Sequence, residues 1–141
     1  GRVKLADIDG DGDLDAVIGA EHANRLIWAE APDNPEDMWP EHVISTDSPA
    51  MSMDVGDLDR DGDPDIVIGE HVGNGRIFVF QNEDQGSSWT ATEIDSGVEH
   101  HVGTQLIDID NDGDLDIIST GWDNTLIMLY ENNAIVNPGD R

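Results

Sequence analysis

A nine-residue string that carries five aspartates occurs three times in this 141-residue chain, at 7–15, 57–65 and 108–116. Each copy has Asp at its first, third, fifth, seventh and ninth positions and Gly at its sixth. Carboxylates packed this densely repel one another unless a cation lies among them. Oxygen ligands in a flexible loop select calcium, and the glycine permits the sharp turn that brings the ligands together. We therefore predict about three calcium ions per chain, held by Asp7, Asp9, Asp11, Asp13, Asp15, Asp57, Asp59, Asp61, Asp63, Asp65, Asp108, Asp110, Asp112, Asp114 and Asp116.

The first half of each string matches the start of an EF-hand loop, but the rest does not. An EF-hand needs a bidentate Glu at its twelfth position and a helix on each side. The twelfth positions here are Ile18, Ile68 and Ser119, and none of them supplies a carboxylate. Short apolar runs rich in β-branched residues follow each string, which predicts strands instead of helices. The EF-hand interpretation is therefore excluded.

The loops recur with a period of 50 to 51 residues, and other features repeat in the same register. Each period holds four short strand-like segments: one enters the aspartate loop, one leaves it, and two follow. A period of this length with four strands is typical of propeller blades. We predict an all-β fold, a partial β-propeller of about three four-stranded blades with a calcium loop between the first two strands of each. The expected blades are 1–46, 50–96 and an incomplete 101–133, followed by a tail over 134–141.

The chain resembles the FG-GAP/VCBS-type repeats found in integrin alpha-subunit propellers and in many bacterial secreted proteins. The resemblance rests on the Asp-x-Asp-x-Asp-Gly-x-x-Asp string that runs into Val/Ile residues, and on the strand end Tyr130-Glu131-Asn132. It implies that the first, third, fifth and ninth loop positions ligate calcium by side chain, and that the seventh does so by its main-chain carbonyl. Pro64, at the eighth position of the second loop, departs from the pattern but removes no ligand.

The number of blades raises a question of closure, because closed propellers have four to eight blades and this chain supplies fewer than three complete ones. An open fan exposes sheet edges and apolar faces. Three arrangements would cover them: a larger propeller of which this is a fragment, closure by oligomerisation, or stacking into a filament. We favour the fragment, an expectation that also fits a chain beginning at Gly1 without a recognisable signal peptide.

The charge balance limits the partners of this protein. Thirty-two acidic residues stand against six Lys and Arg, for a formal charge of −26. Nucleic acids and anionic membranes are bound through Lys/Arg clusters, so we expect neither as a partner. No apolar run approaches the roughly 18 residues of a membrane span, and no cysteine is present. Weak calcium loops need millimolar calcium, which favours a secreted or cell-surface location.

Two residue types outside the loops were considered as functional candidates. The five histidines include His100 and His101 in a link between blades, where propellers often display binding residues, but no nucleophile motif accompanies them. We therefore expect no catalysis by this chain. Trp28, Trp39 and Trp89 occupy repeated positions and are expected to pack between blades, whereas Trp122 in a loop is the expected exposed aromatic residue.

The function that best fits these features is a calcium-stabilised extracellular structural or interaction module that contributes to adhesion or to a surface assembly. Its partner would be an unidentified protein or glycan, or a second copy covering the open blade edges. Two alternatives stay open: the propeller portion of a secreted polysaccharide-degrading enzyme, and a sugar-binding, lectin-like propeller that uses Trp122.

Overall fold

A computed structural model describes residues 2–133, and within that range the fold consists of β-strands and loops. The single helical element of this range is a 3-10 turn, η1, at Glu21–Ala23. The strands form three separate antiparallel sheets, each a meander in chain order. The all-β prediction is thus confirmed for the described residues. The predicted tail, 134–141, lies outside them.

Each sheet begins with a hairpin whose turn is one of the aspartate strings. Sheet 1 contains β1 (Arg2–Ala6), β2 (Asp15–Ala20), β3 (Arg25–Ala29) and β4 (Glu41–Ser45). Sheet 2 contains β5 (Ala50–Gly56), β6 (Asp65–Glu70), β7 (Ile77–Asn82) and β8 (Trp89–Asp95). Sheet 3 contains β9 (Gly103–Ile107), β10 (Asp116–Thr120) and β11 (Ile127–Tyr130).

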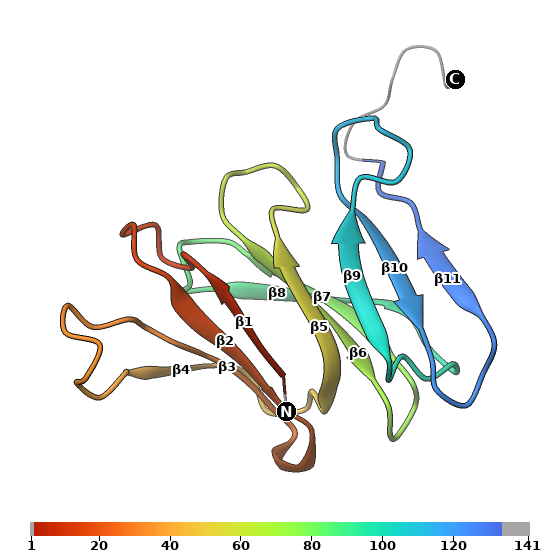
Figure 1. The fold of residues 1–141 in the computed structure, drawn as a ribbon, viewed down its shortest axis with the longest axis horizontal. Helices are drawn as coiled ribbons and strands as arrows, with labels where there is room; N and C mark the ends of the chain where they lie inside the picture. Colours follow the sequence, from red (N-terminus) through yellow and green to blue (C-terminus); the bar gives the residue numbers. More distant parts are fainter. Residues whose placement is uncertain (1, 134–141) are drawn as a thin grey trace.

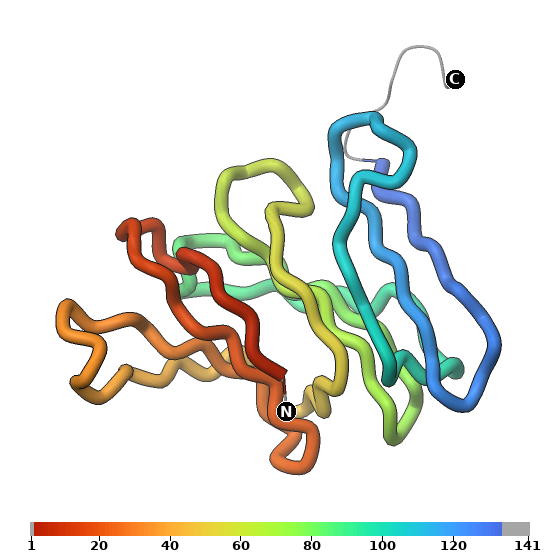
Figure 2. The backbone as a smooth tube through the Cα atoms, viewed as in Figure 1, coloured from red at the N-terminus to blue at the C-terminus, as the bar shows by residue number. Residues whose placement is uncertain are grey.

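The three sheets lie face to face in sequence order, like the ribs of an open fan (Figure 1). Strand β5 contacts β1 and β2 of sheet 1, and β9 contacts β5 and β6 of sheet 2. The first strands of the sheets are therefore neighbours, and the later strands spread outward. The backbone trace shows the three aspartate turns on the same side of the molecule (Figure 2).

Two apolar cores fill the spaces between the sheets, and the same repeat positions build both. Between sheets 1 and 2, Val17 and Trp28 belong to one buried cluster with Ile66 and Phe80. Between sheets 2 and 3, the equivalent pair Val67 and Val79 packs with Ile117 and Tyr130. The two junctions therefore repeat one packing arrangement. Sheet 2 packs one face against the preceding sheet and its other face against the following sheet. The packing role predicted for Trp28 is confirmed, since it is 3% exposed.

The outward faces of the first and last sheets are open. On sheet 1, Val3 pairs across strands with Ile18, and Ile18 pairs with Ile27, so these three share the face opposite Val17. On sheet 3, Ile118 pairs with Leu129 on the face opposite Ile117. Several apolar side chains on these faces or beside them are between 42% and 73% exposed: Val3, Leu5, Leu14 and Val43 on sheet 1, and Ile107, Ile109, Ile127 and Leu129 on sheet 3.

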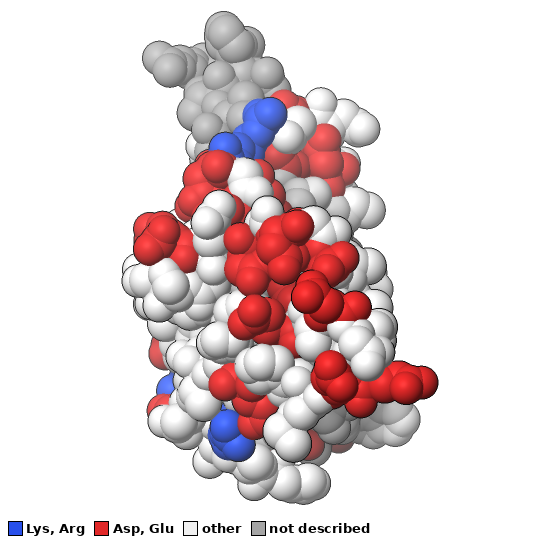
Figure 3. Space-filling view, turned by 90° about the vertical axis from the view of Figure 1, so that its left-hand side faces the viewer, with Lys and Arg blue, Asp and Glu red and all other residues white. Residues whose placement is uncertain are grey.

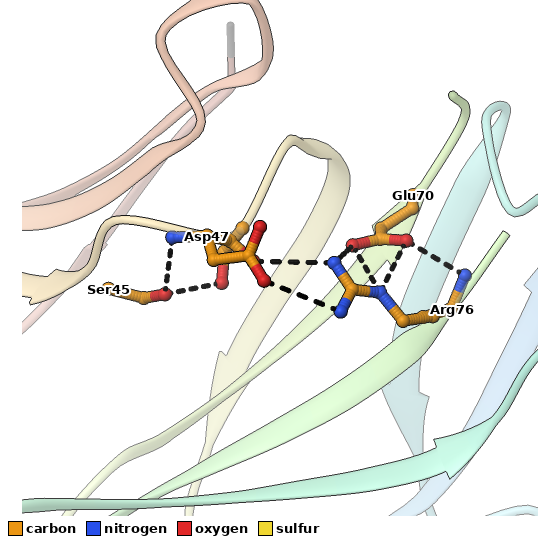
Figure 4. A network of polar contacts seen from close by, with 5 residues as sticks. Ser45, Asp47, Glu70 and Arg76 are labelled. Carbon is orange, nitrogen blue, oxygen red and sulfur yellow. Dashed lines mark hydrogen bonds and ion pairs between the residues drawn. The ribbon is translucent and has the colours of Figure 1, made fainter. Parts of the chain in front are cut away.

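A buried ion pair joins the end of β6 to the start of β7 beside the link between sheets 1 and 2 (Figure 4). The carboxylate of Glu70 is fully buried and accepts hydrogen bonds from the Arg76 guanidinium, with an Nη2–Oε1 distance of 2.6 Å. Arg76 also reaches the link between β4 and β5, where its Nη1 lies 3.6 Å from Asp47 Oδ2. A buried carboxylate requires such a partner, so Arg76 satisfies Glu70 and also contacts the link between sheets 1 and 2.

Candidate metal sites

The three aspartate turns share one backbone conformation. The glycine at the sixth position has a φ angle of 101° in Gly12, 102° in Gly62 and 100° in Gly113. This left-handed geometry favours glycine, which explains why the residue recurs in all three copies. The fourth position is also left-handed in every copy, although it holds Gly10, Arg60 or Asn111 (φ 76°, 66° and 63°).

Carboxylates near the start of each turn accept hydrogen bonds from its backbone N–H groups. In the first turn, Gly12 N donates to Asp7 Oδ2 at 3.0 Å, and Asp11 N donates to Asp9 Oδ1 at 3.2 Å. Asp13 N donates to Asp11 Oδ1 at 2.8 Å. The same bonds recur in the second and third turns. These contacts hold the carboxylates inside the turn, as a compact cation site requires.

The ninth aspartate of each turn fastens the turn to the sheet behind it. Asp65 is fully buried, and its Oδ2 accepts from Leu58 N at 2.8 Å while its Oδ1 accepts from Asn82 N at 2.9 Å. Asp15 binds Ile8 N and Ala31 N in the same way, and Asp116 binds Ile109 N and Asn132 N. The ninth position therefore joins the second residue of its turn to a residue at the end of the third strand of its sheet or just after it.

In each turn the structure brings three carboxylates together, with one oxygen of each lying within 4.8 Å of the others. The groups are Asp7, Asp9 and Asp15 in the first turn; Asp57, Asp59 and Asp61 in the second; and Asp108, Asp110 and Asp116 in the third. The first and third positions thus belong to every group, and the fifth or ninth position completes it. The remaining predicted ligands lie in the same turns but outside these groups: Asp11, Asp13, Asp63, Asp65, Asp112 and Asp114.

Two carboxylate oxygens in these groups test whether a cation fits. Asp7 Oδ1 and Asp57 Oδ1 are buried and have no hydrogen-bond partner, although the Oδ2 atom of each accepts a glycine N–H. A buried, unpaired carboxylate oxygen carries a large desolvation cost. An ion bound to that oxygen would remove the cost, so the residues of the first two turns fit calcium as a ligand set. In the third turn, Asp108 Oδ1 instead accepts Asp112 N at 3.1 Å.

The electrostatics of the turns also favour a cation. Burial, with added repulsion from neighbouring acids, raises the pKa of Asp9 and of Asp110, against a backbone hydrogen bond that lowers each. Burial raises the pKa of Asp65 to about 6, against the opposing effect of three backbone N–H donors. Acids gather over much of the surface seen in Figure 3, where Lys and Arg are sparse. Negative charge in the turns is therefore under-compensated by the protein itself.

The other sequence candidates lie away from the aspartate turns. His100 is fully buried between sheets 2 and 3, where its Nδ1 lies 2.8 Å from Ser119 Oγ, so it is not displayed to a ligand. The ring of His101 is stacked on that of His71, at 3.9 Å between centroids. Trp122 is 74% exposed, as predicted, and its ring centroid lies 6.2 Å from that of His101.

The sequence profile of the FG-GAP-like repeat matches residues 7–68 and again 64–119. Together the two matches cover more than half of the chain, and each contains at least one complete aspartate turn. The chain belongs to the FG-GAP-like repeat family. Repeats of this family are structural and interaction modules that are not generally catalytic. Comparisons with curated proteins and with solved structures returned no match. Within the described residues, no helix is long and apolar enough to cross a membrane.

Sequence reasoning missed two asparagines that contact the turns from outside. Asn82 is the last residue of β7, Asn132 follows the end of β11, and each reaches the turn of the preceding sheet. Asn82 Nδ2 donates to Ile8 O at 3.0 Å, and Asn132 Nδ2 donates to Leu58 O at 2.8 Å. The available signal was that the two asparagines recur one repeat period apart in the sequence. Each hydrogen bond joins two successive repeats, and a motif that describes one repeat does not contain such a contact.

Proposed function

We propose that this FG-GAP-like chain is a calcium-stabilised extracellular interaction module, built as a segment of a β-propeller. Each aspartate turn would bind one calcium ion through its first and third carboxylates and one or two further ligands of the same turn. Bound calcium would neutralise the clustered charges and order the turn, so its role would be structural. The extracellular assignment follows from the family, whose repeats are typical of extracellular proteins, and from the millimolar calcium found there.

The observation that carries this proposal is the pair of buried, unpartnered oxygens on Asp7 and Asp57. Each lies in a turn whose other carboxylates already use backbone N–H donors, so no hydrogen-bond donor of the protein completes them. Calcium accepts six to eight oxygen ligands and tolerates the irregular geometry of such a turn. Magnesium requires a more regular octahedron and keeps several waters, which makes it the poorer fit.

Isothermal titration calorimetry of the chelator-treated chain tests the proposal directly. We expect about three calcium sites per chain, and the single substitutions Asp9→Ala, Asp59→Ala and Asp110→Ala, at the third position common to all three carboxylate groups, should each remove one. Magnesium at the same concentration should release less heat and should not compete effectively. A chain that takes up no calcium would refute the proposal.

The open outer faces support a specific partner, which is a second copy of this chain. By repeat position, the outer face of sheet 3 is equivalent to the face of sheet 2 that packs on sheet 3. The outer face of sheet 1 is equivalent to the face of sheet 2 that packs on sheet 1. Trp39 lies in the loop before β4, where its indole Nε1 donates to Pro35 O at 3.2 Å; the indole of its equivalent, Trp89, donates to Gly86 O at 3.1 Å. We propose that the sheet 3 face of one copy seats on the sheet 1 face of the next, a place that further repeats would take in a longer protein.

Sedimentation velocity of charge variants tests this head-to-tail pairing. Val3→Asp and Ile127→Asp should each reduce self-association in the presence of calcium, because each places a charge on one outer face. A mixture of the two variants should recover dimers, since one intact head meets one intact tail. Val72→Asp, at an exposed apolar residue in the β6–β7 turn, serves as the matched control. A wild-type chain that stays monomeric at 100 µM would contradict this pairing, as would a mixture that stays monomeric.

A further inference from the structure

Asn82 and Asn132 occupy the same place in two successive sheets, and each connects two aspartate turns. Asn82 is fully buried and lies at the end of β7. Its backbone N–H donates to Asp65 of its own sheet's turn, while its side chain donates to Ile8 of the preceding turn. Its side-chain oxygen accepts from Gly86 N at 2.6 Å, so every polar atom of the amide is used.

The carbonyl that Asn82 binds belongs to a residue between two predicted calcium ligands. Ile8 stands between Asp7 and Asp9, both members of the first carboxylate group. Ile8 is therefore held twice: its N–H by Asp15 of the same turn, at 2.8 Å, and its carbonyl by the following sheet. The orientation of the peptide groups on either side of Ile8 sets the direction of the two flanking carboxylates.

The second junction repeats this arrangement. Leu58 lies between Asp57 and Asp59, donates its N–H to Asp65, and accepts from Asn132 Nδ2 at its carbonyl. The backbone N–H of Asn132 in turn donates to Asp116 of the third turn at 2.8 Å. Hydrogen bonds to side chains thus form one continuous path through the three turns, in the order Asp15, Ile8, Asn82, Asp65, Leu58, Asn132 and Asp116.

We propose that Asn82 and Asn132 are positioning residues that tune the calcium affinity of the turn before them and couple neighbouring calcium sites. This inference rests on the proposed calcium function. Each asparagine acts through the residue between two ligands and makes no contact with the ion. Because its backbone is fixed by the ninth aspartate of its own turn, ordering of one turn favours ordering of the next. Coupling of this kind is reciprocal, so calcium in either turn should raise the affinity of the other.

The third turn supplies an internal comparison. Ile109 occupies the position of Ile8 and Leu58, and among residues 2–133 no asparagine from a following sheet reaches its carbonyl. The third turn should therefore bind calcium more weakly than the first two.

Single-site backgrounds of the full chain allow a decisive test. One background keeps only the first turn, and the other keeps only the second, after paired Asp→Asn changes at the first and third positions of the remaining turns. Asn82→Asp or Asn132→Asp is then added to each background, and calcium affinity is measured by calorimetry. The aspartate retains an acceptor for Gly86 N but loses the donor to Ile8 O. Its added negative charge would by itself attract calcium, so a loss of affinity reports the altered contact with the carbonyl, where a carboxylate oxygen replaces the donor.

The expected result is a crossed pattern. Asn82→Asp should weaken the first turn about tenfold, the usual size of an outer-shell effect on a metal site. Asn132→Asp should weaken the second turn by a similar factor and leave the first within about twofold. A general loss of stability cannot produce this selectivity. Equal effects of both variants on both turns, or no effect on either, would overturn the positioning role even if wild-type chain binds three calcium ions.

If a single-site background does not fold, hydrogen exchange of the otherwise wild-type chain provides a second test. In the otherwise wild-type chain at saturating calcium, Asn82→Ala should speed amide exchange over residues 7–13 and leave 108–114 unchanged. Asn132→Ala should speed exchange over 57–63 and leave 7–13 unchanged. Uniform acceleration in all three turns would argue against selective positioning. If the wild-type chain takes up no calcium, the calcium function itself fails, which is a separate result.

Discussion

The second and third aspartate turns share their five aspartates and their glycine but have different surroundings. Leu58 and Ile109 hold the same position in the two turns, yet Leu58 is 6% exposed and Ile109 is 42% exposed. Leu58 belongs to the core between sheets 2 and 3, and its carbonyl is bound by Asn132. Ile109 has no following sheet among the described residues. The aspartate string therefore defines the shape of a turn, while the neighbouring sheet determines how firmly that shape is held.

Removal of calcium should have the largest effect on the melting temperature. It should also reduce the difference in local stability between the second and third turns. Without the ion, the clustered aspartates of every turn repel one another. At calcium concentrations about 100-fold above Kd, each site contributes about 2.7 kcal/mol. Three sites would then raise the melting temperature by on the order of 15 °C or more in a chain of this size. Scanning calorimetry with and without a chelator measures the change, and a shift of less than about 3 °C would count against structural calcium.

Truncation of Leu58 and of its equivalent Ile109 should lower the free energy of unfolding by different amounts. Leu58→Ala should lower the free energy of unfolding by about 2–4 kcal/mol because it leaves a cavity in the second core. Ile109→Ala should cost less than about 1 kcal/mol because that side chain is half exposed. Urea denaturation in calcium measures both values. Equal losses would show that the two turns are packed alike in solution, for example through self-association.

Acidification should affect the calcium-free and calcium-loaded chains in opposite directions. Burial raises the pKa of Asp65 to about 6, above its ordinary value of 3.8, so the folded state binds a proton more readily than the unfolded state. In the calcium-free chain this contribution is fully present below about pH 4 and is lost as the pH rises through about 6. The calcium-loaded chain should instead lose stability as the pH falls through about 6, because protons compete with calcium. Melting temperatures at pH 4.5 and 7.5, with and without calcium, test this difference.

Trp122→Ala should have the smallest effect on stability, within about 0.5 kcal/mol, because its side chain is 74% exposed. Trp28→Ala, the matched aromatic change in the first core, should cost about 3–5 kcal/mol. A glycan array on both the wild type and Trp122→Ala separates the lectin alternative from the structural module. Sugar binding that disappears in the variant would favour the lectin reading.

Much of the fold could be predicted because each copy of the repeat marks the positions of its hairpin and strands in the sequence. The aspartate strings located the hairpins, and the apolar runs after them located β2, β6 and β10. The predicted exposure of Trp122 and burial of Trp28 are also confirmed. These properties depend on short-range patterns, namely alternation within strands and turn residues between them.

The contacts between repeats could not be predicted in the same way. Asn132 contacts Leu58 across 74 residues, and although the strand end Tyr130-Glu131-Asn132 resembles the family, the local sequence does not name the residue that its amide binds. His100 was considered for display to a ligand, but the fold places it in a buried network with Ser119 and Thr104. Both residues depend on which face of one sheet meets the next, and that information lies in tertiary packing.

The double hydrogen bond of the ninth aspartate has a consequence for how these loops can diversify. Since Asp15, Asp65 and Asp116 clamp the base of each hairpin, the tip tolerates exchange, as Gly10, Arg60 and Asn111 illustrate at one corresponding place. The residue at this place can change to any type that tolerates a left-handed backbone, while the aspartates on either side of it are kept. Each turn can thus present a different side chain to solvent without losing its predicted calcium ligands.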